Sequence, residues 1–231
     1  MEVLEEVVLA AASGLAREVA DAIRAAGTYR LAGMVDDNPR LHGTLSGGVP
    51  VLGGVELLQR LPDTRIVLCP GAGRSRVALA DRLSRSGVEP ERYATVVHPR
   101  ASLGGSCTVG RGSIVLAGVV ATADVTIGSH VVIMPNSVLT HDDAIGDFAT
   151  ICASASLAGG VTVGTGAYLG TACAVRENLR IGAWSLLGMG AVAIRDVPAG
   201  ETYVGNPARP LRAQGRPGHP VHRATETSVT F

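Results

Sequence analysis

The second half of the chain is built on an uninterrupted six-residue period. An aliphatic residue or alanine returns at every sixth position from Leu103 to Leu187. The fourth residue after each of these positions is small or β-branched, except at Asp143 and Leu179. An aliphatic residue followed by glycine also recurs every 18 residues, at Val109-Gly110, Ile127-Gly128, Ile145-Gly146, Val163-Gly164 and Ile181-Gly182. A fixed short period indicates one structural unit stacked on copies of itself.

Three hexads in each 18-residue period describe a triangular coil whose short strands each point one aliphatic side chain inward. Neighbouring coils would pair as parallel strands about 4.8 Å apart. A helix would need apolar spacings of three and four, which this segment lacks. Glycine makes up 30 of the 231 residues and aromatic residues only 3%, a balance that suits tight corners and a thin aliphatic core. The sequence therefore predicts a parallel β-helix of hexapeptide repeats.

The first part of the chain has an alternating pattern instead. Strands are predicted at 6–11, 31–35, 65–69 and 94–97, and helices at 15–26, 55–60 and 74–86, with a Gly- and Pro-rich loop over 38–54. This alternation predicts a small Rossmann-like parallel sheet flanked by helices, so the fold class is α/β followed by all-β. We expect a β/α domain at 1–98, a coil domain at 99–212 and a disordered tail at 213–231, where no periodicity remains.

Charge and hydropathy exclude several classes of protein. The formal net charge is zero, which gives no electrostatic case for binding nucleic acid or an anionic membrane. No charged-then-apolar leader opens the chain and no apolar run approaches 18 residues, so we expect a cytoplasmic protein. Cys69, Cys107, Cys152 and Cys173 have no CxxC spacing and are expected to be buried, inert thiols.

The predicted β/α domain has a candidate nucleotide site at its first strand-to-helix turn. Ser13 and Gly14 stand where a helix N-terminus would meet phosphate, and Ser13 is also a plausible helix cap. Asp36 and Asp37 follow the second predicted strand, near the spacing at which a carboxylate takes a ribose hydroxyl. The full GxGxxG fingerprint is missing, which argues against a nicotinamide dehydrogenase. Ordinary turn chemistry is the alternative interpretation of these four residues.

Several stretches together resemble one known family. They are Ala12-Ser13-Gly14, Asp36-Asp37, Val97-His98-Pro99, Leu139-Thr140-His141-Asp142, Ile145-Gly146-Asp147-Phe148 and Tyr203-Val204-Gly205-Asn206-Pro207-Ala208-Arg209. With the hexads, they resemble the hexapeptide-repeat acyltransferases, in particular the nucleotide-sugar N-acetyltransferases and sialic acid O-acetyltransferase-like proteins. The resemblance covers roughly residues 5 to 212. It implies a left-handed coil, a homotrimer with active sites between subunits, and acetyl-CoA as donor.

Acyl transfer to an amine or hydroxyl requires a base, and histidine is best suited near neutral pH. His141 is followed by two acids, Asp142 and Asp143, and the family motif places its base at this histidine. Asp142 is the expected orienting group. Asp143 occupies a usually small corner position, so it either reaches solvent or serves as a second orienting group. His130 is expected to be a solvated corner residue.

The 18-residue period places Gly159 one coil beyond His141, where its N–H would stabilise the oxyanion of the reacting thioester. The alternative is that Gly159 and Gly160 simply turn a corner. The resemblance assigns the donor to later segments, through Gly170, Thr171, Gly188, Gly190, Asn206 and Arg209. Metal-dependent hydratase chemistry would need several converging histidines, and the coils hold only His130 and His141, so no metal is expected.

Three positions depart from the family pattern where acceptor recognition is expected. Leu15 replaces a histidine after Ser-Gly, Met134 replaces an asparagine, and Thr150 replaces a second active-site histidine. The leading hypothesis is transfer of acetyl from acetyl-CoA directly to an amino group of a nucleotide-linked sugar. The alternatives are O-acetylation of a free sugar or natural-product hydroxyl, and a non-catalytic scaffold.

Overall fold

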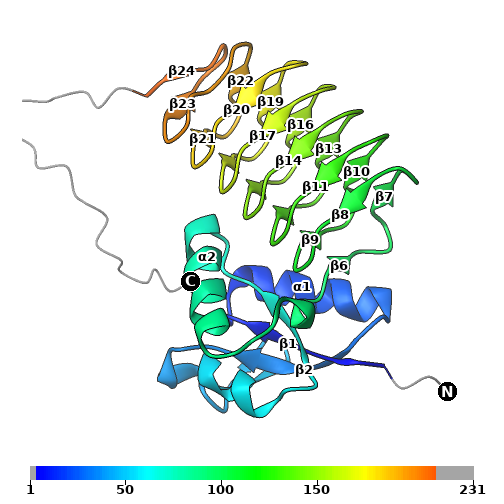
Figure 1. Ribbon diagram of the computed structural model, residues 1–231, viewed down its shortest axis with the longest axis vertical. Helices are drawn as coiled ribbons and strands as arrows, with labels where there is room; N and C mark the ends of the chain where they lie inside the picture. The colour runs from blue at the N-terminus through cyan, green and yellow to red at the C-terminus, as the bar shows by residue number, and fades with distance from the viewer. Residues whose placement is uncertain (1–3, 212–231) are drawn as a thin grey trace, which may run out of the picture.

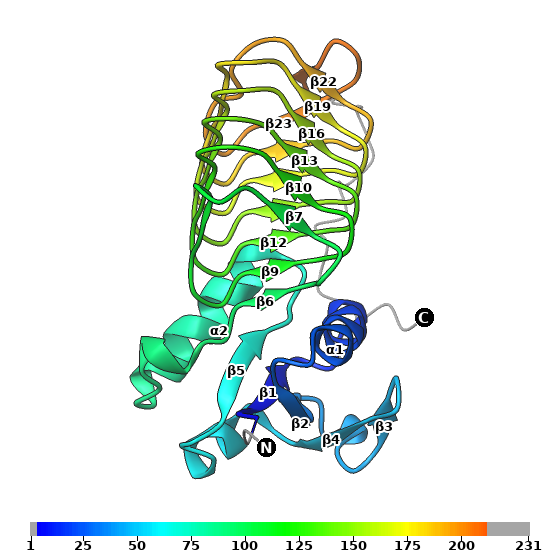
Figure 2. The ribbon, with the colours of Figure 1, turned by 90° about the vertical axis from the view of Figure 1, so that its right-hand side faces the viewer.

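The computed structural model describes residues 4–211. A small α/β unit lies beside one flank of a long three-sided prism of stacked coils (Figures 1 and 2). The prism is a left-handed parallel β-helix, so the fold predicted from the hexads and from the alternating pattern is confirmed. The predicted disordered tail, 213–231, lies outside the described residues.

The α/β unit contains one five-stranded sheet in the order β3-β4-β2-β1-β5. The elements are β1 (Glu6–Ala10), α1 (Gly14–Ala26), β2 (Arg30–Val35), η1 (Pro39–Leu41), β3 (Leu45–Ser46), β4 (Val49–Gly53), η2 (Val55–Arg60), β5 (Arg65–Leu68), α2 (Gly73–Arg85) and η3 (Pro90–Arg92). Only the pairing of β3 with β4 is antiparallel. The alternating side chains of β1 divide between two clusters: Val7 and Leu9 pack with α1, and Val8 and Ala10 pack with Leu83 of α2. The two helices therefore cover opposite faces of the sheet.

Helix α1 begins and ends at the residues that its sequence indicates. Ser13 has an extended backbone, and its Oγ accepts the Ala16 N–H at 3.1 Å, which confirms the predicted cap. Gly27 ends the helix in the left-handed region at φ 64°, where glycine carries no steric penalty. The buried face follows the 3.6-residue period through Leu15, Val19 and Ile23.

Two predictions for this unit were wrong. Residues 38–54 are not only loop, because β3 and β4 form a hairpin there and β4 extends the parallel sheet beside β2. The strand predicted at 94–97 is shorter, Val96–Val97, and only an isolated bridge of Tyr93 to Ile66, just before it, reaches the small sheet. The strand itself pairs with β9 of the coil instead, so main-chain pairing of the prism begins before the first hexad.

The coil consists of three flat sheets, one on each side of the prism. The first contains β6 (Val96–Val97), β9 (Ile114–Val115), β12 (Val132–Ile133), β15 (Thr150–Ile151), β18 (Tyr168–Leu169), β21 (Leu186–Leu187), β23 (Thr202–Val204) and β24 (Arg209–Pro210). The second contains β7 (Ser102–Leu103), β10 (Val120–Ala121), β13 (Val138–Leu139), β16 (Ser156–Leu157), β19 (Ala174–Val175) and β22 (Val192–Ala193). The third contains β8 (Thr108–Val109), β11 (Thr126–Ile127), β14 (Ala144–Ile145), β17 (Thr162–Val163) and β20 (Arg180–Ile181).

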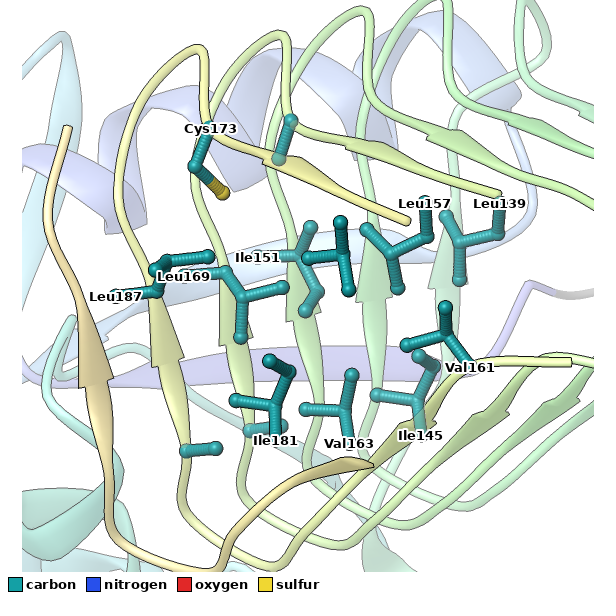
Figure 3. Close-up of a cluster of buried hydrophobic side chains, with 14 of the residues drawn as sticks. Leu139, Ile145, Ile151, Leu157, Val161, Val163, Leu169, Cys173, Ile181 and Leu187 are labelled. Atoms are coloured by element: carbon teal, nitrogen blue, oxygen red, sulfur yellow. The ribbon is translucent and has the colours of Figure 1, made fainter. Parts of the chain in front are cut away.

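The 18-residue period is the stacking period of the prism. Leu139 pairs with Leu157 and Ile145 with Val163, in register along parallel strands. Figure 3 shows the resulting rows of aliphatic side chains inside the coil. Leu103 and Val109, at the open end, are only partly buried, whereas the later hexad positions are buried.

From Gly112 to Gly190, each corner of the prism turns through one residue in the left-handed region, the fourth of its hexad. Non-glycine examples include His130 (φ 54°), Asp142 (φ 63°) and Asn178 (φ 60°), and Gly160 takes the position at φ 72°. Asn and Asp tolerate this conformation because their short polar side chains bond locally. The residue just before it, such as His141 or Gly159, then lies at the outer edge of the corner.

The α/β unit is fixed to the prism by a buried arginine on α2. Arg76 is fully buried and its guanidinium donates to carbonyl oxygens of both parts: Pro70, Gly71, His130, Phe148 and Ala149, at 2.8 to 3.0 Å. It also donates to Thr150 Oγ1 at 3.0 Å. Nearby, Arg74 stacks over the Trp184 ring at 4.6 Å. These contacts seat α2 on the corner that carries His130, Phe148 and Trp184.

Candidate active site

His141 and Asp142 form an exposed pair at the corner between β13 and β14. Nδ1 of His141 lies 2.7 Å from Oδ2 of Asp142, and both side chains are about two-thirds exposed, at 68% and 66%. A carboxylate can only accept, so Nδ1 carries the proton in this contact and Nε2 presents its lone pair outward. The arrangement is that of a histidine base held in one tautomer by a neighbouring acid.

The ring of His141 lies over the backbone of Gly159 on the next coil. A methyl group placed on the Gly159 Cα would come within 2.3 Å of the His141 Cε1 and 2.5 Å of its Nε2. The turns are also linked by the Gly160 N–H, which donates to the His141 carbonyl at 2.9 Å. The N–H of Gly159 has no hydrogen-bond acceptor within residues 4–211. The stacking predicted from the period therefore places an available N–H beside the imidazole.

Asp143 does not reach solvent, and that alternative was wrong. Its side chain is 1% exposed, and its two oxygens accept the N–H groups of Thr140 (2.9 Å) and Val161 (2.8 Å). Burial raises the pKa of this carboxyl to about 6, and the two N–H bonds oppose that rise. Asp143 thus lies buried beneath the His141 turn.

A pocket of about 360 Å³ opens at the carboxyl ends of β1, β2 and β5. Asp36 and Asp37 line it, together with Ala11, Pro70 and the α2 side chains Ser75 and Arg82. Arg82 pairs with both oxygens of Asp37, at 2.5 and 3.1 Å, and holds the pKa of that carboxyl below its usual value. Ligands of open α/β sheets bind at this edge.

Asp36, Ser13 and Gly14 organise the turn beside this pocket. The two oxygens of Asp36 accept the N–H groups of Ala12 (2.8 Å) and Asn38 (2.9 Å). Ser13 Oγ donates to the Cys69 carbonyl at 2.7 Å while it caps α1. Gly14 is the exposed first residue of α1, but neither Ser13 nor Gly14 lines the pocket.

The residues that the resemblance assigns to the donor lie on a different corner from His141. Thr171 and Gly190 occupy the turns after β18 and β21, where the Gly190 N–H donates to the Thr171 carbonyl at 2.8 Å. Gly170 and Gly188 precede these turns, and Asn206 and Arg209 are exposed beside the final hairpin. A side chain on Gly170 would collide with the Met189 N–H at 2.5 Å. A single chain therefore does not join these residues to His141.

The three departures from the family pattern lie between the two parts of the chain. Thr150 is 3% exposed, donates to the Gly71 carbonyl at 3.1 Å and accepts from Arg76. Met134 and Leu15 pack in the apolar cluster that joins α1 to the first coil strands. In this chain these residues contribute to the contact between the domains.

His130 is not a solvated corner residue, so that prediction was wrong. It is 7% exposed, stacked on Phe148 at 4.9 Å and met edge-on by Tyr93 at 4.5 Å. Burial, assisted by the positive charge of Arg76, lowers the His130 pKa to about 4. The corner is covered because α2 docks on it. The repeat pattern of the coil contains no information about this contact with another part of the chain.

Arg76 and Arg82 were missed by the sequence reasoning. Both lie on a polar helix where arginines are ordinarily solvated, and the sequence carries no signal that one is buried. The described residues contain no cluster of three or more His, Cys, Asp or Glu side chains placed to hold a metal ion. Within residues 4–211, no helix combines the length and apolarity needed to cross a bilayer.

The prism and its His–Asp corner define a hexapeptide-repeat transferase, and comparisons with known proteins agree. Residues 6–83 match the PglD N-terminal domain family. A mutant of perosamine N-acetyltransferase from Caulobacter crescentus, solved in complex with CoA and GDP-perosamine, is 31% identical, with a TM-score of 0.84 over 91% of this chain and 99% of that chain. The acetyltransferase domain of PglB from Neisseria gonorrhoeae FA1090, solved in complex with acetyl coenzyme A, is 29% identical, with a TM-score of 0.82 over 90% of this chain and 100% of that chain.

A curated relative, UDP-N-acetylbacillosamine N-acetyltransferase from Bacillus subtilis (strain 168), is 33% identical over 119 residues. The match spans 49% of this chain and about half, 52%, of that relative. The chain belongs to the hexapeptide-repeat nucleotide-sugar N-acetyltransferases, as its near full-length match to the Caulobacter enzyme shows. The expectation of an acyltransferase from the sequence is thereby confirmed.

Proposed function

We propose that the protein transfers an acetyl group from acetyl-CoA to the amino group of a nucleotide-linked sugar, with His141 as general base. The observation that carries this proposal is the His141 ring, which is held by Asp142 and lies against the Cα of Gly159, whose N–H is free of hydrogen bonds within residues 4–211. The family relatives solved with CoA, acetyl-CoA or GDP-perosamine support the choice of donor and acceptor class.

In the proposed reaction the acceptor nitrogen attacks the thioester carbonyl carbon directly. Nε2 of His141 takes the proton that the nitrogen loses as the N–C bond forms. The Gly159 N–H donates to the oxyanion, and collapse of the intermediate breaks the C–S bond. The proton then passes to the departing CoA sulfur. Asp142 keeps the imidazole in the required tautomer and stabilises the imidazolium.

The nucleotide part of the acceptor is proposed to occupy the pocket lined by Asp36 and Asp37, beside the α1 turn of Ser13 and Gly14. This assigns nucleotide binding to residues 1–98 and acyl transfer to the coil domain, 99–212. Met134 and Thr150, expected in acceptor recognition, contribute to the contact between the domains in this chain.

We propose a homotrimer, because these parts lie apart in one chain. The α/β unit is seated on the corner of His130 and Phe148, His141 lies on the next corner, and Thr171 and Gly190 lie on the third. A neighbouring subunit would bring the donor segments Gly170–Thr171, Gly188–Gly190 and Asn206–Arg209 to His141. We therefore propose active sites between subunits. The cytoplasmic location stays a prediction.

The test is a screen of UDP-, GDP- and dTDP-linked amino sugars with acetyl-CoA, in which the product is identified by mass. We expect one amino sugar to gain an acetyl group and the matching hydroxy sugar to remain unchanged. Transfer to a hydroxyl, with no binding of any nucleoside diphosphate by calorimetry, would establish O-acetylation instead. Absence of acetyl-CoA binding would favour the remaining alternative, a non-catalytic scaffold protein.

A further inference from the structure

The main-chain ladder of the prism is broken at one hexad, next to His141. From Gly104 to Gly188, the second residue of each hexad donates its N–H to a carbonyl of the following coil, as Thr122 does to Leu139 at 3.1 Å. Thr140 is the exception within this span. Its N–H donates to Asp143 Oδ2 at 2.9 Å, and its hydroxyl takes over the Leu157 carbonyl at 3.0 Å.

The other oxygen of Asp143 changes the facing turn as well. In turns such as Gly164–Ala167 and Gly170–Cys173, the fifth residue of the hexad donates its N–H to the carbonyl three residues earlier. Val161 instead donates to Asp143 Oδ1 at 2.8 Å, across to the preceding coil. One carboxylate therefore replaces a ladder bond in the His141 turn and a closing bond in the Gly159 turn.

Folding alone does not require a carboxylate at this position. The equivalent residues one coil before and after are Val125 and Val161, both fully buried. A buried carboxyl must be desolvated, and for Asp143 this burial raises the pKa to about 6. Residues that break a local rule in this way are expected where function imposes the geometry.

We propose that Asp143 is a positioning residue that sets the placement of the His141 turn against the Gly159 turn. The proposal rests on the proposed role of His141 as base. The Thr140 and Val161 bonds flank His141 and Gly159 in the chain, so the carboxylate fixes both turns from beneath. Loss of these bonds would let the ordinary ladder form and move the imidazole relative to the Gly159 amide. A displacement of a catalytic group by about 1 Å lowers turnover more than it lowers substrate binding.

The experiment compares Asp143→Val and Asp143→Ser with a matched control, Ser113→Val. Valine is the residue at the equivalent position of the coils before and after, Val125 and Val161. Serine keeps one bond, since Ser113 Oγ at the equivalent place accepts the Val131 N–H one coil on, at 2.9 Å. Ser113→Val removes that bond at a different corner. Melting temperature, kcat and both KM values are measured for each protein.

We expect kcat to fall about 10- to 100-fold in Asp143→Val, with both KM values within about threefold and the melting temperature retained. Asp143→Ser should be intermediate, and Ser113→Val should keep kcat within about twofold. Wild-type kcat in a folded Asp143→Val would overturn the proposal. If the valine variant melts early, the serine variant decides: wild-type kcat there overturns the proposal, and reduced kcat at wild-type stability supports it.

His141→Ala, assayed alongside, separates the two proposals. Full activity of His141→Ala would remove the proposed base and with it the premise for Asp143. An inactive His141→Ala together with a fully active Asp143→Val would leave the base in place and refute the positioning role alone.

Discussion

The imidazole of His141 lies over the backbone of Gly159, although 18 residues separate them in the chain. The coil brings them together because one turn of the prism takes three hexads. The proposed base and the proposed oxyanion donor are therefore carried by neighbouring turns of one rigid element, and not by mobile loops. Such an arrangement fixes the geometry before substrate arrives.

Gly159→Ala should disable the enzyme without unfolding it. The added methyl group would lie 2.3 to 2.9 Å from atoms of the His141 ring, so the ring must turn away. Gly159 is not among the residues with positive φ, so alanine is compatible with its backbone. We expect turnover to fall at least about 10²-fold with a melting temperature close to that of the wild type.

The control for Gly159→Ala is Gly105→Ala, at the equivalent corner position near the open end of the coil. A methyl group there meets no atom within 4 Å, so activity and stability should both be retained. Wild-type turnover in folded Gly159→Ala would show that the ring position seen here is not the reactive one.

His130→Phe should keep turnover and change the response of stability to pH. The Nδ1 of His130 is buried without a hydrogen-bond partner, and the ring stacks on Phe148, so phenylalanine fits the site. The His130 pKa is lowered from 6.5 to about 4 in the folded protein. Between these two pH values the unfolded chain binds a proton at His130 that the folded chain does not bind. Stability is therefore lost as pH falls below about 6.5.

Relative to the wild type, His130→Phe should lose about 2 kcal/mol less stability between pH 7.5 and pH 5.0. Urea unfolding at the two pH values, with the m-values compared, measures this difference. An equal loss in both proteins would mean that His130 is accessible to protons in the folded state.

Arg76→Met should weaken the attachment of the α/β unit to the prism. Methionine fills part of the volume, but it leaves the carbonyls of His130, Phe148 and Ala149 without their donor. We expect unfolding to be easier by about 3 kcal/mol in urea. Arg74→Ala, which removes only the stacking over Trp184, should cost about 1 kcal/mol or less. Equal stability of the two variants would contradict the role given to Arg76.

Asp37→Ala should weaken binding of the preferred nucleoside diphosphate at least about 10-fold. The change removes a carboxylate that is proposed to accept a ribose hydroxyl. It also releases Arg82, another residue of the pocket, from the ion pair that holds it in place. Isothermal titration with the nucleotide found in the substrate screen measures the effect. Asp63→Ala, an exposed change outside this pocket, serves as control. Unchanged affinity in Asp37→Ala would contradict the proposal that the nucleotide binds in this pocket.

The repeat was sufficient to predict the prism because the aliphatic residue of each hexad marks a side chain that points into the core. Leu139, Leu157 and Val175 could be stacked from their spacing alone, and so could His141 and Gly159. What the spacing could not predict is which corners are covered. His130 and Thr150 are buried because α2 docks there through Arg76, a long-range contact with no local signature. Asp143 likewise takes its role from the N–H groups of two turns, which only the stacked structure brings together.

The most direct measurement is the rate of acetyl transfer by wild type and His141→Ala, with acetyl-CoA and the nucleotide-linked amino sugar, followed by mass. If His141 is the base, the variant should bind both substrates and be about 10² to 10⁴ times slower. Transfer by a correctly assembled His141→Ala within a few-fold of the wild-type rate would contradict the proposed mechanism.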